Sequence, residues 1–413
     1  MSVSHGFKKL VKVREAVSIL LNTFKNLEPS IEEVSLTEAY GRVTCCDIIA
    51  PMDVPHFNRS AVDGYAVKAE ATFEASQLNP KRFRVIEKLE PTEGMFCEDD
   101  IALKISTGQP VPDSLNAVVM LEVVSEANGF IEVYSPISPF KNISRKGEDV
   151  RKGEIIVEKG TIIGPQHMGL IASCGLTRVP VYRKIKVLVV SSGEEVVAPG
   201  KPITHQEIYD SSSYVLYGLI KRKLSEPWLY PKSPITSSIK DILEALDYGL
   251  KEFDITIFIG GTSVGQTDII PRTLAKEGNL LFHGVAMKPG MPTAALNIDN
   301  KPVFCLPGPP VACFFSFLEI VAPLIEAIYK IKKTFKPVVK ARLRRRIAGE
   351  VGKRVYVRVL LKESNGYIEA EPIAAGGASI LSSLCKAQGY VVLNEDLDSL
   401  NEGDVVDVYL LEG

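Results

Sequence analysis

The spacing of apolar residues changes along the chain from helical to strand-like. Near the start, five apolar residues between Val13 and Phe24 recur every three to four positions, which predicts an amphipathic helix within residues 9–25. Residues 81–150 hold short β-branched runs separated by glycine, proline and asparagine. We expect strands there at 83–86, 102–106, 117–124 and 130–134. Residues 151–180 continue with short strands and one helix near 166–173.

From residue 185 onward, strands with a buried pattern alternate with amphipathic helices. Strands are expected at 185–190, 254–259, 280–285 and 303–306, and helices at 211–224, 237–253, after 268, and at 311–330. Asp210 stands where it can cap the helix that begins at Ser211. This alternation is typical of a doubly wound α/β domain, whose ligands bind beyond the carboxyl ends of the strands. The tail returns to strands, at 355–361, 367–371, 390–393 and 405–410.

A chain of 413 residues exceeds one ordinary domain. The changes in pattern predict a multidomain protein of the α/β plus β class. Residues 8–50 and 150–180 are expected to form an N-terminal linker domain of helix and strand, with a β-rich second domain over 51–149 between them. The doubly wound α/β domain is expected over 181–331 and a C-terminal all-β domain over 335–413.

The most informative stretch joins the strand after Asp254 to a glycine loop that ends at Asp268. Its three glycines permit a tight turn and a close approach of backbone N–H groups to a ligand, and the following helix adds its positive end. Residues 260–267 differ from a nucleotide P-loop at Gln266, which stands where the phosphate-binding lysine is required. We therefore expect another kind of phosphate site, with Asp268 suited to a metal ion.

Four glycine-containing loops follow strands of this domain and should meet at one edge of its sheet. They span 191–195, 260–268, 288–292 and 307–310. Each alone fits an ordinary connection from strand to helix, but together they carry hydroxyls, carboxylates and a lysine, which favours a binding edge. Earlier in the chain, Asp63 stands at an Asp-Gly step expected to turn. Its carboxylate either satisfies its own turn or faces a ligand, and the sequence leaves both open.

Composition excludes several classes of protein. The formal charge of −2 does not suggest a nucleic-acid binder, and no run approaches the roughly 18–20 apolar residues of a membrane span. The first residues lack the apolar core of a signal peptide. Seven scattered cysteines without a Cys-x-x-Cys pair, and five histidines without ligand spacing, argue against a zinc or disulfide framework. We expect a cytoplasmic protein with reduced thiols.

Several motifs resemble those of the molybdopterin molybdenumtransferases, a family that shares its architecture with the C-terminal part of gephyrin. They are Ser-Ala-Val-Asp-Gly-Tyr-Ala (60–66), Thr-Gly-Gln-Pro-Val-Pro (107–112), Arg-Lys-Gly-Glu-Asp (145–149), Ser-Ser-Gly-Glu-Glu (191–195), Gly-Gly-Thr-Ser-Val-Gly (260–265), Met-Lys-Pro-Gly-Met-Pro (287–292) and Leu-Pro-Gly (306–308). The resemblance covers nearly the whole chain.

This resemblance implies an elongated four-domain homodimer whose α/β domain binds adenylylated molybdopterin. Molybdate or tungstate enters the dithiolene, and Mg²⁺ assists hydrolysis of the phosphoanhydride with release of AMP. The implied catalytic carboxylates are Asp63, Asp149, Glu195 and Asp268, and the last two are also the implied metal ligands. The implied substrate-binding positions are Thr107, Ser191, Ser192, Gly193, Asp210, Gly260, Gly261, Ser263, Gly265, Lys288, Pro289, Gly290, Pro292, Pro307, Gly308, Arg358 and Ser379.

The sequence departs from the family pattern mainly on the oxyanion side. Met291 replaces the second lysine of Lys-Pro-Gly-Lys-Pro, and Ala312 replaces a serine. Each charge-assisted hydrogen bond lost in this way is worth about 1.5–3 kcal/mol. Elsewhere, Ile259, Pro309 and Ser144 stand where the family usually has serine, asparagine and arginine. We expect an intact nucleotide side and a weakened oxyanion side.

Two other functions stay open on the sequence alone. The α/β domain could adenylylate molybdopterin, although the related single-domain proteins that do so lack the flanking β domains. The chain could also be a weakened paralogue that binds the pterin or a partner as a scaffold. Magnesium-dependent AMP release from the adenylylated pterin, with and without molybdate, separates the three. The sequence does not choose between molybdate and tungstate.

The resemblance also predicts that each active site uses two chains, with Asp63 of one subunit facing the α/β domain of the other. Mixing Asp63→Asn chains with Asp268→Asn chains should therefore restore one intact site in each mixed dimer. Under random exchange about half of the dimers are mixed, so AMP release should recover to roughly a quarter of wild type. If both inactive variants stay inactive after verified subunit exchange, the two carboxylates serve the same chain's site.

Overall fold

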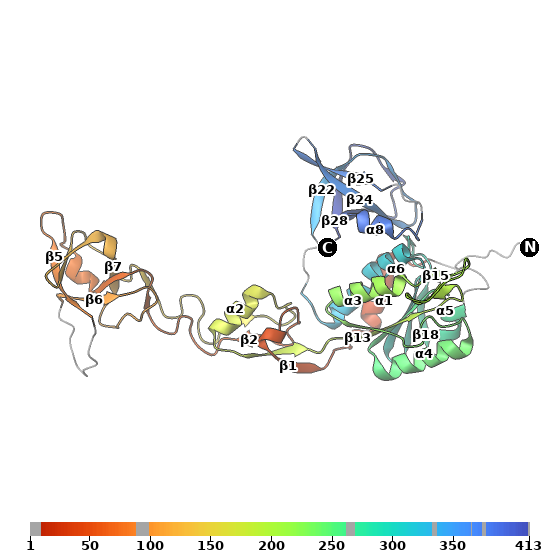
Figure 1. The fold of residues 1–413 in the computed structure, drawn as a ribbon, viewed down its shortest axis with the longest axis horizontal. Coiled ribbons are helices and arrows are strands. Elements are labelled where there is room, and N and C mark those ends of the chain that lie inside the picture. The colour runs from red at the N-terminus through yellow and green to blue at the C-terminus, as the bar shows by residue number, and fades with distance from the viewer. Residues whose placement is uncertain are drawn as a thin grey trace, which may run out of the picture. The chain divides into compact units, whose positions relative to one another are not determined.

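The computed structural model describes residues 10–87, 99–261, 269–332, 337–364, 366–373 and 377–411. The chain forms two compact units, residues 33–181 and the remainder, which comprises residues 1–32 and 182–413. The multidomain α/β plus β class expected from the sequence is confirmed, since the second of these units contains a doubly wound α/β sheet and a separate β-barrel (Figure 1).

The α/β domain is built on a six-stranded sheet in the order β16-β13-β17-β21-β20-β18. The first four strands in this order run parallel, while β20 is antiparallel to both of its neighbours. The chain passes from β13 outward to β16 and then back across to β17. The strand order therefore reverses between β13 and β17, which is where ligands bind in such sheets. The strands are β13 (Lys186–Ser191), β16 (Glu226–Leu229), β17 (Ile255–Ile259), β18 (Asn279–His283), β20 (Ala294–Ile298) and β21 (Lys301–Leu306).

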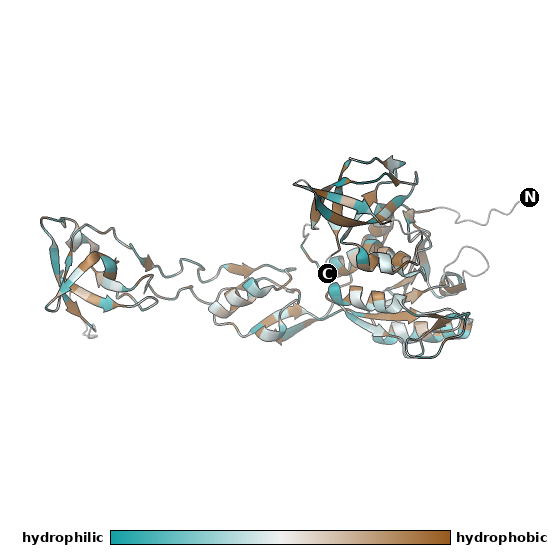
Figure 2. Ribbon diagram, turned by 45° about the horizontal axis from the view of Figure 1, so that its top comes forward, coloured by the Kyte–Doolittle hydropathy of each residue, from teal (hydrophilic) through white to brown (hydrophobic). Residues whose placement is uncertain are grey.

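Helices cover both faces of this sheet (Figure 1). On one face lie α4 (Ile239–Glu252) and α5 (Ile269–Leu274), and on the other α1, α3 and the long helical segment that follows β21. Every residue of β17 is buried, as expected for a central parallel strand covered on both sides. Figure 2 shows the same contrast, with mostly hydrophobic strands beneath helices of mixed polarity. The remaining bounds are α1 (Val13–Thr23) and α3 (Ser212–Arg222).

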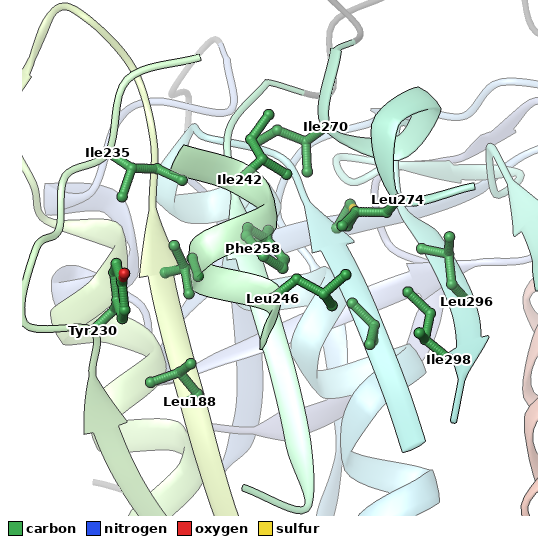
Figure 3. Close-up of a cluster of buried hydrophobic side chains, with 14 of the residues drawn as sticks. Leu188, Tyr230, Ile235, Ile242, Leu246, Phe258, Ile270, Leu274, Leu296 and Ile298 are labelled. Atoms are coloured by element: carbon green, nitrogen blue, oxygen red, sulfur yellow. The ribbon is translucent and has the colours of Figure 1, made fainter. Parts of the chain in front are cut away.

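The core under α4 and α5 shows how the apolar pattern folds the domain (Figure 3). Ile242 and Leu246 of α4 are one turn apart and point to the sheet, where Leu188 and Phe258 are fully buried. Ile270 and Leu274 of α5, again one turn apart, extend the cluster over β20. Each such side chain contributes about 1.5–3 kcal/mol relative to an exposed one.

One helical segment corrects the sequence analysis. Among the described residues, Pro310–Ile328 is a 19-residue stretch long and apolar enough to cross a membrane by length and composition, although no such run was expected. It is 67% buried inside the protein, as in the core helix of a folded domain. The segment consists of α6 (Pro310–Ser316), a π-helical turn (Phe317–Val321) and α7 (Ala322–Ile328). The wider turn precedes Pro323, which has no N–H for the preceding turn.

The C-terminal domain is a barrel. Its strands follow the order β24-β25-β22-β28-β26, and a further pairing of β26 with β24 closes the ring. The strands are β22 (Val338–Leu343), β24 (Arg354–Ser364), β25 (Tyr367–Pro372), β26 (Gly389–Leu393) and β28 (Val405–Leu410). Val359, Ala370, Val391 and Val408 are almost completely buried in its interior. Helix α8 (Ser382–Lys386) precedes β26.

The barrel is joined to the α/β domain by a strand that the sequence analysis did not anticipate. In the connection between β18 and β20, the two-residue strand β19 (Met287–Lys288) pairs in parallel with the start of β24. The neighbouring Arg354 N–H donates to the Ala286 carbonyl at 2.9 Å. Aromatic packing reinforces the contact, because Tyr356 of β24 stacks on Phe315 of α6 with ring centroids 4.9 Å apart.

The unit of residues 33–181 contains its own six-stranded sheet, in the order β7-β4-β6-β5-β9-β8. The run 117–124, expected as one strand, is divided by a 3₁₀ turn at Leu121–Val123. The strands of this sheet are β4 (Gly64–Val67), β5 (Lys81–Ile86), β6 (Ile101–Ile105), β7 (Ala117–Met120), β8 (Val124–Ala127) and β9 (Phe130–Val133). Short pairs form between β1 (Ile31–Ser35) and β12 (Arg178–Tyr182), β2 (Ile48–Ile49) and β11 (Ile155–Val157), and β3 (Arg59–Ser60) and β10 (Ile143–Ser144). Helix α2 (Pro165–Ser173) contacts β11.

We predict opposite stability effects for two helical glycines. A Cβ on Gly249 of α4 would lie 2.3 Å from Thr256 Oγ1, so Gly249→Ala should reduce the free energy of unfolding by about 1–3 kcal/mol. A Cβ on Gly218 of α3 meets nothing within 4 Å. Gly218→Ala should therefore raise it by about 0.5–1 kcal/mol. Chemical denaturation of both variants measures the difference, and equal effects would contradict the close packing of α4 on β17.

Candidate functional site

Three strand-end loops of the α/β domain are tied to one another at the point where the strand order reverses. After β13, the N–H and Oγ of Ser192 donate to the Ile259 carbonyl at 3.0 and 2.9 Å. After β17, the Gly260 N–H donates to the Leu306 carbonyl at 3.0 Å. The Gly260 amide is thus used inside the fold, between two of the strand-end loops.

Two of the predicted glycines are required by space as well as by backbone conformation. Gly260 and Gly261 have φ angles of +88° and +59°. A Cβ on Gly260 would lie 2.6 Å from the Ser192 carbonyl oxygen, and one on Gly261 would lie 2.8 Å from Cδ1 of Ile270. Real Cβ atoms do not approach other atoms so closely. These glycines therefore let the loops after β13 and β17 and helix α5 pack against one another.

Two cavities open along this edge, both within the unit that holds the α/β domain and the barrel. The first, of about 730 Å³, has a lining that includes the loop Met287–Pro292, Ala312, and residues of the barrel. The second, of about 920 Å³, is lined largely by residues after β13 and before α3. Both linings include Glu195, Gly260, Gly261, Gly308 and Pro309. The two cavities are therefore adjacent and meet at the strand ends.

The first cavity is the cationic one. Its described lining holds three cations, Lys288, Lys353 and Arg358, with Glu195 and Glu350 as the carboxylates. Lys288 Nζ lies 3.0 Å from Glu350 Oε2, and Lys353 Nζ bonds to the other oxygen of the same carboxylate. Hydrogen bonds from Lys353 and Lys288 lower the pKa of Glu350, so the carboxylate is charged at neutral pH. Burial lowers the pKa of Arg358, which is 8% exposed.

The loop that carries Lys288 has a fixed shape. The Lys288–Pro289 peptide is cis, and Gly290 has a φ of +118°. A Cβ on Gly290 would lie 2.8 Å from Ser316 Oγ. The buried hydroxyl of Thr293 donates to the Gly290 carbonyl at 2.7 Å and lies 2.8 Å from Ser316 Oγ. The backbone of residues 288–293 is therefore anchored to α6, while Met291 and Pro292 line the cavity.

The second cavity is lined by hydroxyl groups and one buried carboxylate. Asp210 is 7% exposed and accepts a hydrogen bond from the Ser213 N–H at 3.0 Å, which confirms its predicted capping of α3. Ser212 Oγ donates to the Gly308 carbonyl at 2.6 Å and so ties α3 to the loop after β21. Burial raises the pKa of the Cys313 thiol, and the negative charge of Asp210 raises it further. The predicted residues in this lining are Ser191, Ser192, Gly193, Glu195, Asp210, Gly260, Gly261, Gly308 and Ser379.

Three motifs of the other unit come together around Asp63 and Thr107. The Thr107 N–H and Oγ1 donate to Asp63 Oδ1 at 2.7 and 3.1 Å, so Asp63 holds another loop rather than its own turn. Gly64 begins β4 instead of forming a turn, and a Cβ there would lie 2.0 Å from the Val119 carbonyl oxygen. The 143–149 segment joins them through the pairing of β10 with β3. Asp149 is exposed at the end of this segment.

The structure brings most of the predicted α/β residues together at the two cavities. Lys288, Pro289, Gly290, Pro292, Pro307, Gly308 and Arg358 line the first. Ser263, Gly265 and Asp268 lie outside the described residues. Among the described residues, no three His, Cys, Asp or Glu side chains gather as a metal site. Glu350, Lys353 and Tyr356 also line the first cavity and were missed, because only the pairing of β19 with β24 reveals their position.

Curated relatives match this architecture along almost the whole chain. A Methanocaldococcus jannaschii protein assigned to molybdopterin biosynthesis is 36% identical over 417 residues, covering 98% of this chain and 99% of the relative. The molybdopterin molybdenumtransferase of Bacillus subtilis is 31% identical over 410 residues, covering 97% and 94%. The chain belongs to the molybdopterin molybdenumtransferase family. It is an enzyme of that family.

Family models and a solved structure agree with this assignment. The MoeA N-terminal region (domains I and II) matches residues 11–175, the "Probable molybdopterin binding domain" residues 188–327, and the MoeA C-terminal region (domain IV) residues 340–411. The crystal structure of a molybdopterin biosynthesis MoeA protein from Pyrococcus horikoshii is 33% identical, with a TM-score of 0.83 over 97% of this chain and 100% of that chain. The family's fold, with a central α/β domain, β-rich flanking domains and a C-terminal barrel, is the fold described above.

Proposed function

We propose that this enzyme inserts molybdate or tungstate into adenylylated molybdopterin and releases AMP in a magnesium-dependent step. The observation that carries the proposal is the pair of adjacent cavities at one sheet edge. One is cationic, with Lys288 and Arg358, and the other is rich in hydroxyls, with Glu195 between them. A dianionic metal oxyanion suits the first cavity and a phosphorylated nucleotide the second. The dithiolene of the pterin would then lie where the two meet.

The residues present are compatible with magnesium. Mg²⁺ is commonly held by one or two carboxylates together with phosphate oxygens of the substrate and water. Glu195 is exposed at the border of the two cavities and can serve as one such carboxylate, with Asp268 proposed as the other. Bound there, the ion would neutralise charge on the phosphoanhydride as the P–O bond breaks. Asp210 and the serine hydroxyls would orient the nucleotide.

Water must add to phosphorus as the anhydride breaks, so one phosphate leaves as AMP and the other stays with the pterin. Gly260 and Gly261 permit the close packing of the strand ends. Loops packed in this way would hold the bond near the anion site. We also propose that the active form is a homodimer in which Asp63, Thr107 and Asp149 of one subunit complete the site of the other.

A cytoplasmic location is in line with the six described cysteines, all free thiols.

The decisive experiment measures AMP release from adenylylated molybdopterin with and without Mg²⁺ and molybdate. Magnesium-dependent release that requires the oxyanion supports the transferase. Formation of adenylylated molybdopterin and pyrophosphate from ATP and free molybdopterin would indicate an adenylyltransferase instead. Binding of the pterin without turnover would indicate a scaffold.

We predict that Glu195→Gln and Asp268→Asn each slow AMP release at least about a hundredfold, since ligands of a catalytic metal supply several kcal/mol of charge stabilisation. Both variants should remain folded, because neither carboxylate is expected in the core. Glu252→Gln, an exposed carboxylate on α4, is the matched control and should leave turnover unchanged. A folded Asp268→Asn enzyme with the wild-type rate would refute the magnesium assignment.

We predict that Met291→Lys strengthens oxyanion binding about tenfold, the size of one added charge-assisted hydrogen bond. Met291 lines the same cavity as Lys288, so a lysine there adds a donor. Titration of molybdate and tungstate on both proteins measures the effect. Val338→Lys, which adds the same charge at an exposed position of β22, should leave affinity unchanged. Unchanged affinity in Met291→Lys would mean that another cation already serves this part of the cavity.

A further inference from the structure

A carboxylate of the protein itself forms ion pairs with two of the cations that line the first cavity. Glu350 Oε2 lies 3.0 Å from Lys288 Nζ, and Oε1 bonds to Lys353 Nζ. Neither Glu350 nor Lys353 belongs to the motifs that identified the site. Both residues belong to the lining of the cavity, together with Arg358.

The backbone fixes these groups relative to one another. Glu350 and Lys353 form a tight turn closed by the Lys353 N–H, which donates to the Glu350 carbonyl at 2.9 Å. Gly352 within this turn has a φ of +90° and donates its N–H to the Glu395 carbonyl at 2.7 Å. Lys288 is placed by the pairing of β19 with β24, in which it lies opposite Val355. The three side chains therefore meet because of local and inter-strand hydrogen bonds.

The side chains themselves are free enough to rearrange. The side chains of Lys288, Glu350 and Lys353 are 64%, 38% and 24% exposed. An ammonium group has three donors, so each lysine keeps donors beyond the one it gives to Glu350. A tetrahedral dianion brings two charges and four oxygens, whereas Glu350 offers one charge and two oxygens. The dianion can therefore compete for both lysines, and Glu350 repels it as long as the carboxylate stays in place.

We propose that Lys353 is an additional oxyanion-binding residue and that Glu350 is the resident carboxylate which the incoming dianion displaces from Lys288 and Lys353. This inference rests on the proposed function, in which the first cavity takes molybdate or tungstate. It assigns to the C-terminal barrel two residues that set the affinity of the site. Lys353 supplies a cation from the barrel, whereas Met291 of the 287–292 loop supplies none.

The test is a calorimetric titration with tungstate in the absence of pterin, at fixed ionic strength and neutral pH. Glu350→Gln keeps the shape of the side chain but removes the competing charge, so tungstate should bind about tenfold more tightly. Lys353→Gln should bind it about tenfold more weakly, and Lys353→Arg should stay within about twofold of wild type. Glu363→Gln and Lys362→Gln, exposed on β24, the strand that follows the turn of Glu350 and Lys353, are the matched controls and should not change the affinity.

The double variant separates direct binding from indirect effects. If Lys353 contacts the oxyanion, Lys353→Gln should still weaken binding by about tenfold when Glu350 is already Gln. If Lys353 only neutralises Glu350, the second substitution has no effect in that background, which would overturn its assignment. Thermal unfolding of each variant confirms that it is folded, and Lys353→Arg tests the cation should Lys353→Gln be unstable.

Each outcome decides the proposal. Tighter binding by Glu350→Gln, with weaker binding by Lys353→Gln in both backgrounds, supports it. Unchanged binding by Glu350→Gln would show that Glu350 does not compete with the anion and would overturn the proposal. Weaker binding would also overturn it and would indicate that Glu350 braces Lys288. No measurable binding by Glu350→Gln would also overturn it. The titration measures oxyanion binding alone, because it contains no adenylylated pterin. Failure of AMP release would therefore contradict the proposed function, whereas the tungstate affinities of the variants decide the roles of Glu350 and Lys353.

Discussion

Two residues of the α/β domain, Met287 and Lys288, form an edge strand on the barrel, and the first cavity depends on that pairing. Together with the stacking of Tyr356 on Phe315, it fixes the position of Arg358 and Lys353 of the barrel relative to Lys288. The same connection is held on its other side by Val11, whose N–H donates to the Gly284 carbonyl at 3.0 Å and whose carbonyl accepts from the Ala286 N–H at 2.8 Å. Segments from three distant parts of the chain thus meet in one short ladder, and long-range backbone hydrogen bonds fix the cavity walls.

The loops at the carboxyl ends of the α/β strands are fixed by close packing rather than by strand pairing. The loops after β13 and β17 and helix α5 pack closely against one another, and glycine at positions 260 and 261 makes that packing possible. The Gly260 amide is used between the strand-end loops, and the lining of the second cavity includes Asp210 and several serine hydroxyls. The two cavities therefore differ in origin. The second belongs almost entirely to one domain, and the first exists only between two.

This difference explains what could be predicted from the sequence. Loops after strongly apolar strands were found because a buried run followed by glycine is a local signal, and Asp210 was found because capping is local as well. Strand β16 was missed since it contains Pro227 and lies at the sheet edge, and β20 since its alanines have low strand propensity. Glu350 and Lys353 could not be found, because nothing near them in the sequence indicates that β24 meets the 287–288 segment. The family resemblance supplied Arg358 for the same site, which the local pattern alone would not have singled out.

The anchoring of the loop at Gly290 has a consequence for how such a site can change over evolutionary time. Its backbone shape depends on Gly290, Thr293 and Ser316, all of which are held by contacts with α6. Met291 lies within the same loop, yet its side chain takes no part in those contacts and faces the cavity. The backbone shape of this short segment and the side chain that it presents to the cavity are therefore determined by different residues. A lineage can exchange the side chain at residue 291, and so change the chemistry of the cavity lining, without having to rebuild the turn that presents it.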